Sequence, residues 1–451
     1  MRAILPPPAP AALRCHVVAT LASLPTADLV AYRDQIQRRY DAFTTRGLAL
    51  DLTRGKPSSD QLALSNALLA LPGESDFTAA DGTDVRNYGG LQGLPELRAL
   101  LAPLFGVPSA QVVFGDNSSL ALMHDAIAFA LLKGTVNSPR PWSQEPRLAF
   151  LCPVPGYDRH FAITEDFGFD LIPVPLGVDG PDMDVVERLV ATDPAVKGIW
   201  CVPKYSNPTG IIYSAGTTER LAAMPAAAPD FRVFWDDAYA VHHLTAERIE
   251  TPNLLEACRR HGHPQRALVF GSTSKVTLAG AGVALFAASP DNVAWYLARM
   301  GKRTIGGDKI NQLRHVRHLK DTAGLLALMD RHRAIVAPKF ASVIDTFERE
   351  LAGSGVATWS VPKGGYFITL DVLDGCAAHV IRLAKAAGVA LTPAGSTYPH
   401  GRDPRDANIR IAPTYPDLAT VPMAAEGVAV SLLLAAATTL LTQRDVYEGQ
   451  R

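Results

Sequence analysis

The sequence predicts an α/β fold, with a large domain that has a mostly parallel mixed sheet covered by helices, and a smaller α+β domain. Two observations support this fold class. Between residues 70 and 320, short apolar segments alternate with helical ones, and after residue 320 a long helical pattern precedes three further strand candidates. Segments that are apolar at nearly every position are typical of strands that helices cover on both faces of a sheet.

Taken in order, the chain begins with a proline-rich segment, and we expect residues 1–20 to form a flexible N-terminal arm. Residues 70–320 form the predicted large domain, with strand candidates at 110–115, 147–156, 196–203, 231–237 and 266–272. Residues 21–69 and 321–451 form the predicted small domain, with strand candidates at 357–362, 364–372 and 407–413.

The composition is that of an ordinary soluble protein. The chain has 451 residues, 48% hydrophobic and 19% charged, and its formal net charge is −1. This balance gives no electrostatic signature of a nucleic acid or an acidic membrane as partner. The longest apolar run, 427–441, is about one helical turn too short to span a bilayer and predicts a packed C-terminal helix. We therefore expect a cytoplasmic protein.

One lysine, Lys275, lies in the otherwise small and apolar stretch 270–286. Such a lysine either extends its stem from the edge of a core or is held for chemistry. Asn207, Asp236 and Tyr239 follow two other predicted strands. Ligands of open α/β sheets bind at the carboxyl ends of the strands, so we expect these four side chains to lie together.

Each of these residues also has a plainer explanation. Asn207 belongs to an Asn-Pro-Thr-Gly sequence, which is a turn signal, and Asp236 or Asp237 can cap a helix. As a set, however, an amide, an acid, a phenol and a lysine match what pyridoxal phosphate requires. This cofactor forms a Schiff base with a lysine, pairs its pyridine nitrogen with an anion and accepts hydrogen bonds at its phenolic oxygen.

These segments, in their order and spacing, resemble the class I aminotransferases of the fold-type I pyridoxal phosphate enzymes. The three that carry the resemblance are SNPTG at 206–210, DDAY at 236–239 and STSK at 272–275. The resemblance extends over residues 50–415 through segments at 88–98, 362–367 and 409–412. The sequences at 51–58, 115–120 and 274–284 are most similar to a divergent subgroup of aspartate aminotransferases.

The resemblance implies a transaminase that moves an amino group between an amino acid, aspartate in that subgroup, and 2-oxoglutarate. It also implies a ping-pong mechanism through a lysine aldimine. In this family Lys275 would carry pyridoxal 5'-phosphate and shuttle the proton of the substrate Cα, and Asp236 would pair with the pyridinium nitrogen. Asn207 and Tyr239 would hydrogen-bond the phenolic oxygen, and Tyr157 would stack on the ring.

The phosphate group is expected where Gly115 ends a strand and a helix begins, because free backbone N–H groups and the helix dipole favour an anion there. The residues assigned to this group are Asn117, Ser118, Ser119, Ser272 and Ser274. In the family, the tyrosine matching Tyr88 reaches the phosphate from the neighbouring subunit, which implies a homodimer with shared active sites. Asn311 is a second candidate for a contact across that interface.

The chain departs from the family at Val283, where most relatives place the arginine that clamps the phosphate. A phosphate in a desolvated site needs compensating charge, so we expect a substitute cation. The candidate is Lys309, acting across the dimer interface beside Tyr88.

Arg410 lies in an Ile-Arg-Ile strand, and its guanidinium suits the α-carboxylate of the substrate. Gly55 matches a backbone contact near the substrate, and Asn207 lies beside the same group in the family. The cation for a distal carboxylate stays open among three residues, Arg54, Lys56 and Arg314.

Two alternatives remain open at this point. The same fold also supports carbon–sulfur lyases and decarboxylases, and a catalytically inactive regulatory relative would keep the fold alone. A nucleotide-binding enzyme is disfavoured because no glycine-rich phosphate motif lies at a strand–helix junction. A metal site is also disfavoured, because neither the histidines nor the five scattered cysteines have ligand spacing.

Overall fold

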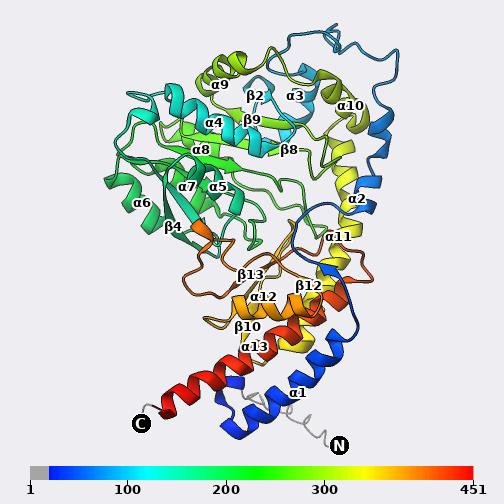
Figure 1. The fold of residues 1–451 in the computed structure, drawn as a ribbon. Helices are drawn as coiled ribbons and strands as arrows, with labels where there is room; N and C mark the ends of the chain where they lie inside the picture. Colours follow the sequence, from blue (N-terminus) through cyan, green and yellow to red (C-terminus); the bar gives the residue numbers. More distant parts are fainter. Residues whose placement is uncertain (1–19, 450–451) are drawn as a thin grey trace, which may run out of the picture.

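The structure is a computed structural model that describes residues 20–449, so the predicted arm lies, except for residue 20, outside the described residues. Figure 1 shows two lobes, a large one built on an eight-stranded sheet and a smaller one that holds the C-terminal helix. The predicted α/β fold class, with its large mixed sheet, is confirmed.

The large sheet has the strand order β2-β9-β8-β7-β6-β3-β4-β5. Its strands are β2 (Val112–Phe114), β3 (Ala149–Val154), β4 (Asp170–Gly177), β5 (Gly180–Pro181), β6 (Val196–Cys201), β7 (Arg232–Asp236), β8 (Ala267–Ser272) and β9 (Ala284–Ala288). Neighbours among β4, β3, β6, β7 and β8 pair in parallel, whereas β9 and β5 pair antiparallel. The carboxyl ends of β3, β6, β7 and β8 therefore meet at one edge of the sheet.

Helices cover both faces of this sheet, because its strands send apolar side chains to both sides. Along β7, Val233 and Trp235 belong to one core and Phe234 belongs to the other. The first core packs under α3 (Pro95–Leu101), α6 (Met183–Thr192), α7 (Ala215–Ala223), α8 (Leu254–Arg260) and α10 (Lys309–Leu319). The second packs under α4 (Ser119–Lys133), α5 (Asp158–Asp166) and α9 (Pro290–Arg303).

The small lobe has an antiparallel sheet of β10 (Ala357–Trp359), β11 (Ile368–Val372) and β13 (Asn408–Ile411). A parallel pair, β1 (Leu50–Asp51) and β12 (Val389–Ala390), adds a second sheet. Its core packs against α1 (Thr26–Thr44), α12 (Ala377–Ala386), α13 (Val421–Gly449) and the later turns of the helix that links the lobes. Short 3₁₀ helices lie at Leu21–Ser23, Ala102–Phe105, Ser109–Gln111, Trp142–Gln144 and Pro399–Gly401.

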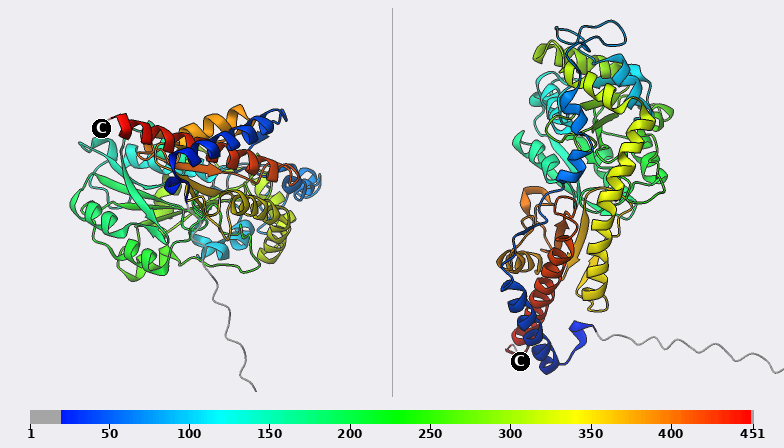
Figure 2. Two further views of the ribbon diagram at one scale, coloured as in Figure 1. Left: turned by 90° about the horizontal axis from the view of Figure 1, so that it is seen from below. Right: turned by 90° about the vertical axis from the view of Figure 1, so that its right-hand side faces the viewer.

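One helix, α11 (Thr322–Leu351), links the two lobes (Figure 1 and right-hand view of Figure 2). Its first turns join the core of the large lobe through Leu325 and Leu328, and its later turns join the small lobe through Phe340 and Phe347. The structure differs from the predicted division at residue 69. Here α2 (Ser59–Ala63) contacts α11 and the 3₁₀ helix Asn66–Ala70 contacts α10, because Leu64 packs on the core of the large lobe.

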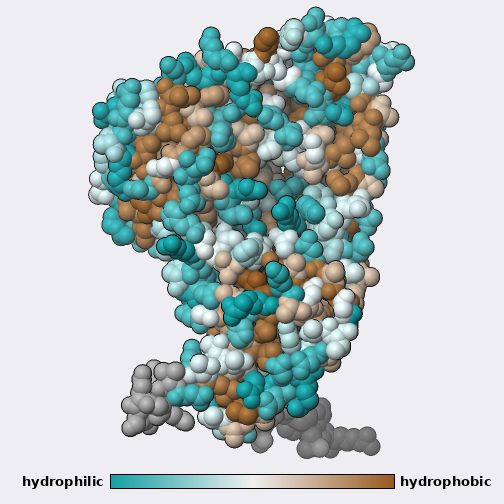
Figure 3. Space-filling model, in the orientation of Figure 1, coloured by the Kyte–Doolittle hydropathy of each residue, from teal (hydrophilic) through white to brown (hydrophobic). Residues whose placement is uncertain are grey.

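The C-terminal helix α13 is long and apolar enough, over Val421–Asp445, to cross a membrane by composition alone. In the structure 78% of its most apolar window is buried, and the helix packs against α1, α11 and α12. It is therefore a packed C-terminal helix, as the sequence predicted. Figure 3 shows hydrophobic patches on the large lobe between hydrophilic residues that cover much of the same face.

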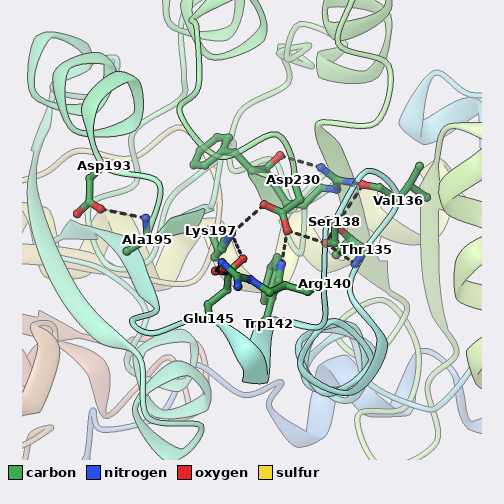
Figure 4. A network of polar contacts seen from close by, with 12 residues as sticks. Thr135, Val136, Ser138, Arg140, Trp142, Glu145, Asp193, Ala195, Lys197 and Asp230 are labelled. Atoms are coloured by element: carbon green, nitrogen blue, oxygen red, sulfur yellow. Dashed lines mark hydrogen bonds and ion pairs between the residues drawn. The ribbon is translucent and has the colours of Figure 1, made fainter.

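A buried polar network ties the amino ends of β6 and β7 to the segment before β3 (Figure 4). Its centre is the fully buried Asp230, which accepts hydrogen bonds from Ser138 at 2.6 Å, Trp142 at 2.8 Å and Lys197 at 3.0 Å. Burial acts to raise the pKa of Asp230, but the bonds from Ser138 and Lys197 outweigh it and hold this pKa below its usual value. Asp230 therefore stays ionised, as the counterion of Lys197.

We predict that Asp230→Ala lowers the free energy of unfolding by about 3–5 kcal/mol at pH 7. The change removes the closer of the two carboxylates that pair with the buried Lys197 ammonium, which keeps only Glu145 at 3.3 Å, and it removes the acceptor of the Trp142 N–H. Urea unfolding measures this change. Because the pKa of Asp230 is lower in the folded than in the unfolded protein, its ionised form stabilises the fold above about pH 4. The difference in unfolding free energy between the wild type and the variant should therefore shrink as the pH falls below that value.

The control is Asp170→Ala, which removes an exposed partner of Arg147 and should cost less than about 1 kcal/mol. A loss in Asp230→Ala no larger than in this control would contradict the assigned role of the network.

Candidate active site

A cavity of about 840 Å³ opens at the edge of the sheet where β3, β6, β7 and β8 end. The large lobe contributes the residues that follow these strands, and the small lobe contributes Phe367, Thr392 and Arg410. Most of the residues that the sequence predicted for the site line this cavity. They are Gly55, Ser118, Ser119, Tyr157, Asn207, Asp236, Tyr239, Ser272, Ser274, Lys275 and Arg410.

Lys275 lies just beyond the end of β8, and its ammonium is 5.1 Å from the centre of the Tyr239 ring. The residue that follows Lys275, Val276, is apolar and buried in the core of the large lobe. Burial lowers the pKa of Lys275, and the charge of Asp236 opposes this shift without cancelling it. A neutral amine is therefore more accessible at Lys275 than at an exposed lysine.

Asp236 ends β7 and is 3% exposed. One carboxylate oxygen, Oδ2, accepts a hydrogen bond from Nε2 of His160 at 3.0 Å. The other, Oδ1, is buried and has no hydrogen-bond partner among residues 20–449. A buried carboxylate oxygen without a partner costs free energy, so this atom is suited to a cationic or N–H group of a ligand.

His160 is a functional candidate that the sequence alone did not indicate. It is 1% exposed, lies in the first turn of α5 and stacks on Trp200 with ring centres 4.5 Å apart. This packing fixes the ring and with it the carboxylate of Asp236. Its only sequence signal is its position three residues after Tyr157, which also lines the cavity.

The neighbouring acid, Asp237, faces away from this cavity, as expected for successive residues at a strand end. It lines a separate cavity of about 560 Å³ together with Lys204 and His243. Burial raises the pKa of Asp237 to about 6, against the lowering effect of Lys204. The two acids of the DDAY segment therefore have different surroundings, and of the two only Asp236 lines the main cavity.

Arg410, on β13, is 8% exposed, and its guanidinium carbon lies 5.0 Å from the centre of the Phe367 ring. Its polar contacts are long, at 3.2 Å to Asp158, 3.4 Å to Asn207 and 3.5 Å to Thr392. Its Nε is buried without a hydrogen-bond partner among the described residues. The guanidinium thus has unused donor capacity beside the cavity.

At the other end of the cavity, Ser118 is the N-cap of α4, and its side chain makes no capping hydrogen bond. The hydroxyl of Ser274 donates to the carbonyl oxygen of Asn117 at 2.8 Å, which ties the segment after β8 to the start of this helix. Asn117 itself lines a smaller neighbouring cavity of about 290 Å³. Val283 is buried, and its N–H donates to Thr273 at 3.0 Å, so this position belongs to the core.

Lys309 does not have the free ammonium that its predicted role requires. It is 4% exposed, and its Nζ donates to the carbonyl oxygens of Asn87 at 2.6 Å and Gly89 at 2.8 Å in the same chain. We therefore replace the predicted phosphate contact by a structural role. Lys309 holds the two carbonyls on either side of Tyr88, whose own side chain is 83% exposed.

The remaining sequence candidates are divided between the cavity and the protein interior. Arg54 and Lys56 line the cavity. Arg314 does not, because its Nε donates to Asn311 at 2.8 Å, and Asn311 in turn donates to the carbonyl oxygen of Gly282 at 2.9 Å. The cavity also holds Asp158 and Arg159, which the sequence did not single out.

Comparisons with known proteins agree with this architecture. Residues 23–444 match the family described as aspartate amino-transferase. An aspartate aminotransferase from Corynebacterium glutamicum is 52% identical over 406 residues, covering 90% of this chain and 94% of that protein. A crystal structure of an aspartate transaminase from the same organism is 50% identical, with a TM-score of 0.92, covering 94% of this chain and all of the other.

A more distant structure shows the fold alone. It is an alpha-aminoadipate aminotransferase from Thermus thermophilus, complexed with N-(5'-phosphopyridoxyl)-L-leucine. It is 23% identical with a TM-score of 0.70, and covers 89% of this chain and 95% of that one.

We predict that Lys309→Met speeds amide hydrogen exchange at residues 87–90 by about tenfold or more. Methionine keeps the length of the side chain but cannot donate to the two carbonyls, a loss of about 1–2 kcal/mol. Hydrogen exchange followed by mass spectrometry measures the exchange rate of this segment. Lys302→Met, at an exposed position of α9, is the control and should leave this segment unchanged. Equal exchange in both variants would show that Lys309 does not hold the loop.

Proposed function

This chain belongs to the aspartate aminotransferase family and is an aminotransferase, and we propose that it moves an amino group from aspartate to 2-oxoglutarate with pyridoxal 5'-phosphate as cofactor. We propose further that it follows a ping-pong mechanism and acts as a cytoplasmic homodimer with shared active sites. The observation that carries the cofactor assignment is the pairing, in one cavity, of Lys275 with the unpartnered Oδ1 of Asp236.

The cavity residues fit pyridoxal phosphate on three counts. Asp236 offers a buried anionic oxygen to a protonated pyridine nitrogen, and that bond would satisfy the atom. The amino end of α4 offers N–H groups, and the hydroxyls of Ser272 and Ser274 lie on the same cavity wall, which suits a phosphate. Lys275 has a lowered pKa, as a lysine needs in order to act as a nucleophile.

When bound, pyridoxal phosphate supplies a carbonyl carbon that takes up the amino group and a ring that accepts electrons from the substrate Cα. The residues of the chain do the rest. Lys275 removes the proton from Cα, and because burial lowers its pKa the neutral amine is more available than at an exposed lysine. His160 orients the carboxylate of Asp236 through its 3.0 Å hydrogen bond. Asn207 and Tyr239 would donate to the phenolic oxygen of the cofactor, and Tyr157 would stack on its ring.

Arg410 binds the α-carboxylate of the substrate. Its guanidinium is buried beside Phe367, where a charge-assisted bidentate bond is stronger than in water. The backbone at Gly55 lines the same cavity and limits the space around the substrate. A side chain at this position would overlap the Phe367 ring. A substrate bound in this way would have its Cα between Arg410 in the small lobe and Lys275 in the large one, since both residues line the same cavity.

The lyase and decarboxylase alternatives receive no support from the comparisons, because the two Corynebacterium glutamicum relatives described above are named as an aspartate aminotransferase and an aspartate transaminase. Membership of this aminotransferase family also argues against the alternative of a catalytically inactive regulatory protein.

The purified protein, loaded with pyridoxal phosphate, is expected to form glutamate from aspartate and 2-oxoglutarate without release of ammonia or carbon dioxide. Lys275→Ala should lower turnover by about 10³-fold or more, because the group that moves the Cα proton is lost. Coupled assays of oxaloacetate and glutamate measure both results. Lys302→Ala, on the exposed side of α9, is the control for a lost surface lysine.

Wild-type turnover in Lys275→Ala would overturn the assignment of this lysine. Release of ammonia or carbon dioxide in proportion to amino acid consumed would instead identify a lyase or a decarboxylase.

A further inference from the structure

A second cavity, of about 300 Å³, lies at the amino ends of β7 and β8, at the opposite edge of the sheet from the candidate active site. Arg232 is the first residue of β7, Arg266 comes directly before β8, and both line this cavity. A strand advances about 3.3 Å per residue, so Arg232 is roughly 13 Å from Asp236 along β7. The two arginines therefore belong to a separate site, which the proposed function does not use.

The two arginines begin neighbouring strands and are both buried. The N–H of Val233 donates to the carbonyl oxygen of Arg266 at 2.8 Å, which fixes the two strand starts side by side. Arg232 is 2% exposed and Arg266 is 6% exposed. Burial lowers the pKa of Arg232 to about 10, and the charge of Arg266 adds to this effect against the opposing charge of Asp230. Two like charges thus act on each other in the protein interior, which costs free energy unless an anion compensates them.

Neither guanidinium has a carboxylate as its partner. Within residues 20–449, the hydrogen bonds of both go to main-chain carbonyls, and neither forms an ion pair. The carboxylate of Asp230 is already used, because its two oxygens accept from Ser138, Trp142 and Lys197 (Figure 4). Of the described residues that line the cavity, none is acidic. The cavity therefore has two positive charges beside it that lack a negative partner.

Both guanidiniums are held in place and still have unused donors. Arg232 donates to the carbonyl oxygens of Phe231 at 3.0 Å and of Val136, but its Nε is buried without a hydrogen-bond partner among the described residues. Arg266 bonds two carbonyl oxygens of α7, at 2.8 and 3.2 Å, both through Nη1. Its Nε and Nη2 make no hydrogen bond within residues 20–449. A ligand that accepts hydrogen bonds would use this remaining capacity.

The rest of the wall suits a small organic molecule. It comes mainly from the two loops that lead into β7 and β8, residues 226–231 and 262–265. Gln265 and His263 add polar groups, and the ring of Phe231 adds apolar surface. The volume is at the lower end of the range for small-molecule sites, so the cavity fits a small molecule rather than a polymer.

We propose that Arg232 and Arg266 form a second ligand site, which binds the phosphate or carboxylate group of a small organic anion. The shared chemistry is an oxyanion that accepts charge-assisted hydrogen bonds from two fixed guanidiniums. The remainder of the ligand lies against Phe231. This site goes beyond the proposed function and does not depend on it.

The test is calorimetric titration of the holoenzyme, freed of excess cofactor, with inorganic phosphate and separately with acetate. At least one probe should bind saturably, with a dissociation constant of about 1 mM or lower, and the tighter of the two identifies the class of anion. Arg410→Leu removes the guanidinium assigned to an anion in the active site. Binding that persists in this variant therefore belongs to the second site.

Arg266→Met keeps the length of the side chain without the guanidinium and should weaken this binding by about tenfold or more. Arg266→Lys should recover part of the affinity, because it restores the charge without the planar fork. Ala226→Phe, at a half-buried position of the wall, should also weaken binding, since its ring fills the cavity and leaves both guanidiniums in place. Arg188→Met, at an exposed position of α6, is the control and should bind like the wild type.

Thermal unfolding provides a second readout that needs no heat of binding. At equal ionic strength, replacing chloride by the tighter probe should raise the melting temperature of the wild type more than that of Arg266→Met. If Arg266→Met does not fold, the same comparison with Ala226→Phe decides.

Two results would overturn the inference. One is the absence of saturable binding of both probes in the Arg410→Leu holoenzyme, and the other is equal affinity in the wild type, Arg266→Met and Ala226→Phe. Either result would leave the two arginines with a structural role alone, through their bonds to main-chain carbonyls. A wild type that transfers no amino group would contradict the proposed function instead, and the titrations would still decide whether this second site exists.

Discussion

A buried carboxylate oxygen without a hydrogen-bond partner costs free energy, and Asp236, which is 3% exposed, has a partner within the described part of the chain at only one of its two oxygens. The site depends on this constraint. His160, itself held on Trp200, keeps Oδ2 in place, so the free Oδ1 has a defined position in the cavity. The charge of Asp236 also limits how far burial lowers the pKa of Lys275. One buried acid thereby presents a fixed oxygen to the cavity and acts on the pKa of its lysine.

The division into two lobes gives the site its second property. The large lobe supplies Lys275 and Asp236 from the ends of parallel strands, whereas Arg410 comes from the sheet of the small lobe. Because α11 belongs to both cores, one continuous helix connects the lobes that carry the two groups. A substrate held between them would have its α-carboxylate on one lobe and its Cα beside the lysine of the other.

Much of this arrangement could be predicted from the sequence, for a physical reason. Strands that are buried on both faces are locally apolar, so their ends are visible, and Asn207, Asp236 and Lys275 each follow such an end. Other features depend on tertiary contacts that no local pattern shows. Lys309 has the sequence of an exposed basic residue, but it is buried against carbonyls more than 200 positions away. His160 is one of three consecutive polar residues at the start of an ordinary helix, and nothing in this local pattern indicates its contact with Asp236.

The most direct test of the central role of Asp236 is the affinity for pyridoxal phosphate, measured by fluorescence titration of Asp236→Asn and Asp237→Asn. Both changes remove one charge with little change of shape, at adjacent positions that face different cavities. We predict that Asp236→Asn weakens binding by about 10–100-fold, since a charge-assisted hydrogen bond is lost, and that Asp237→Asn stays within about twofold of the wild type. Equal losses in the two variants, or a larger loss in Asp237→Asn, would contradict the account.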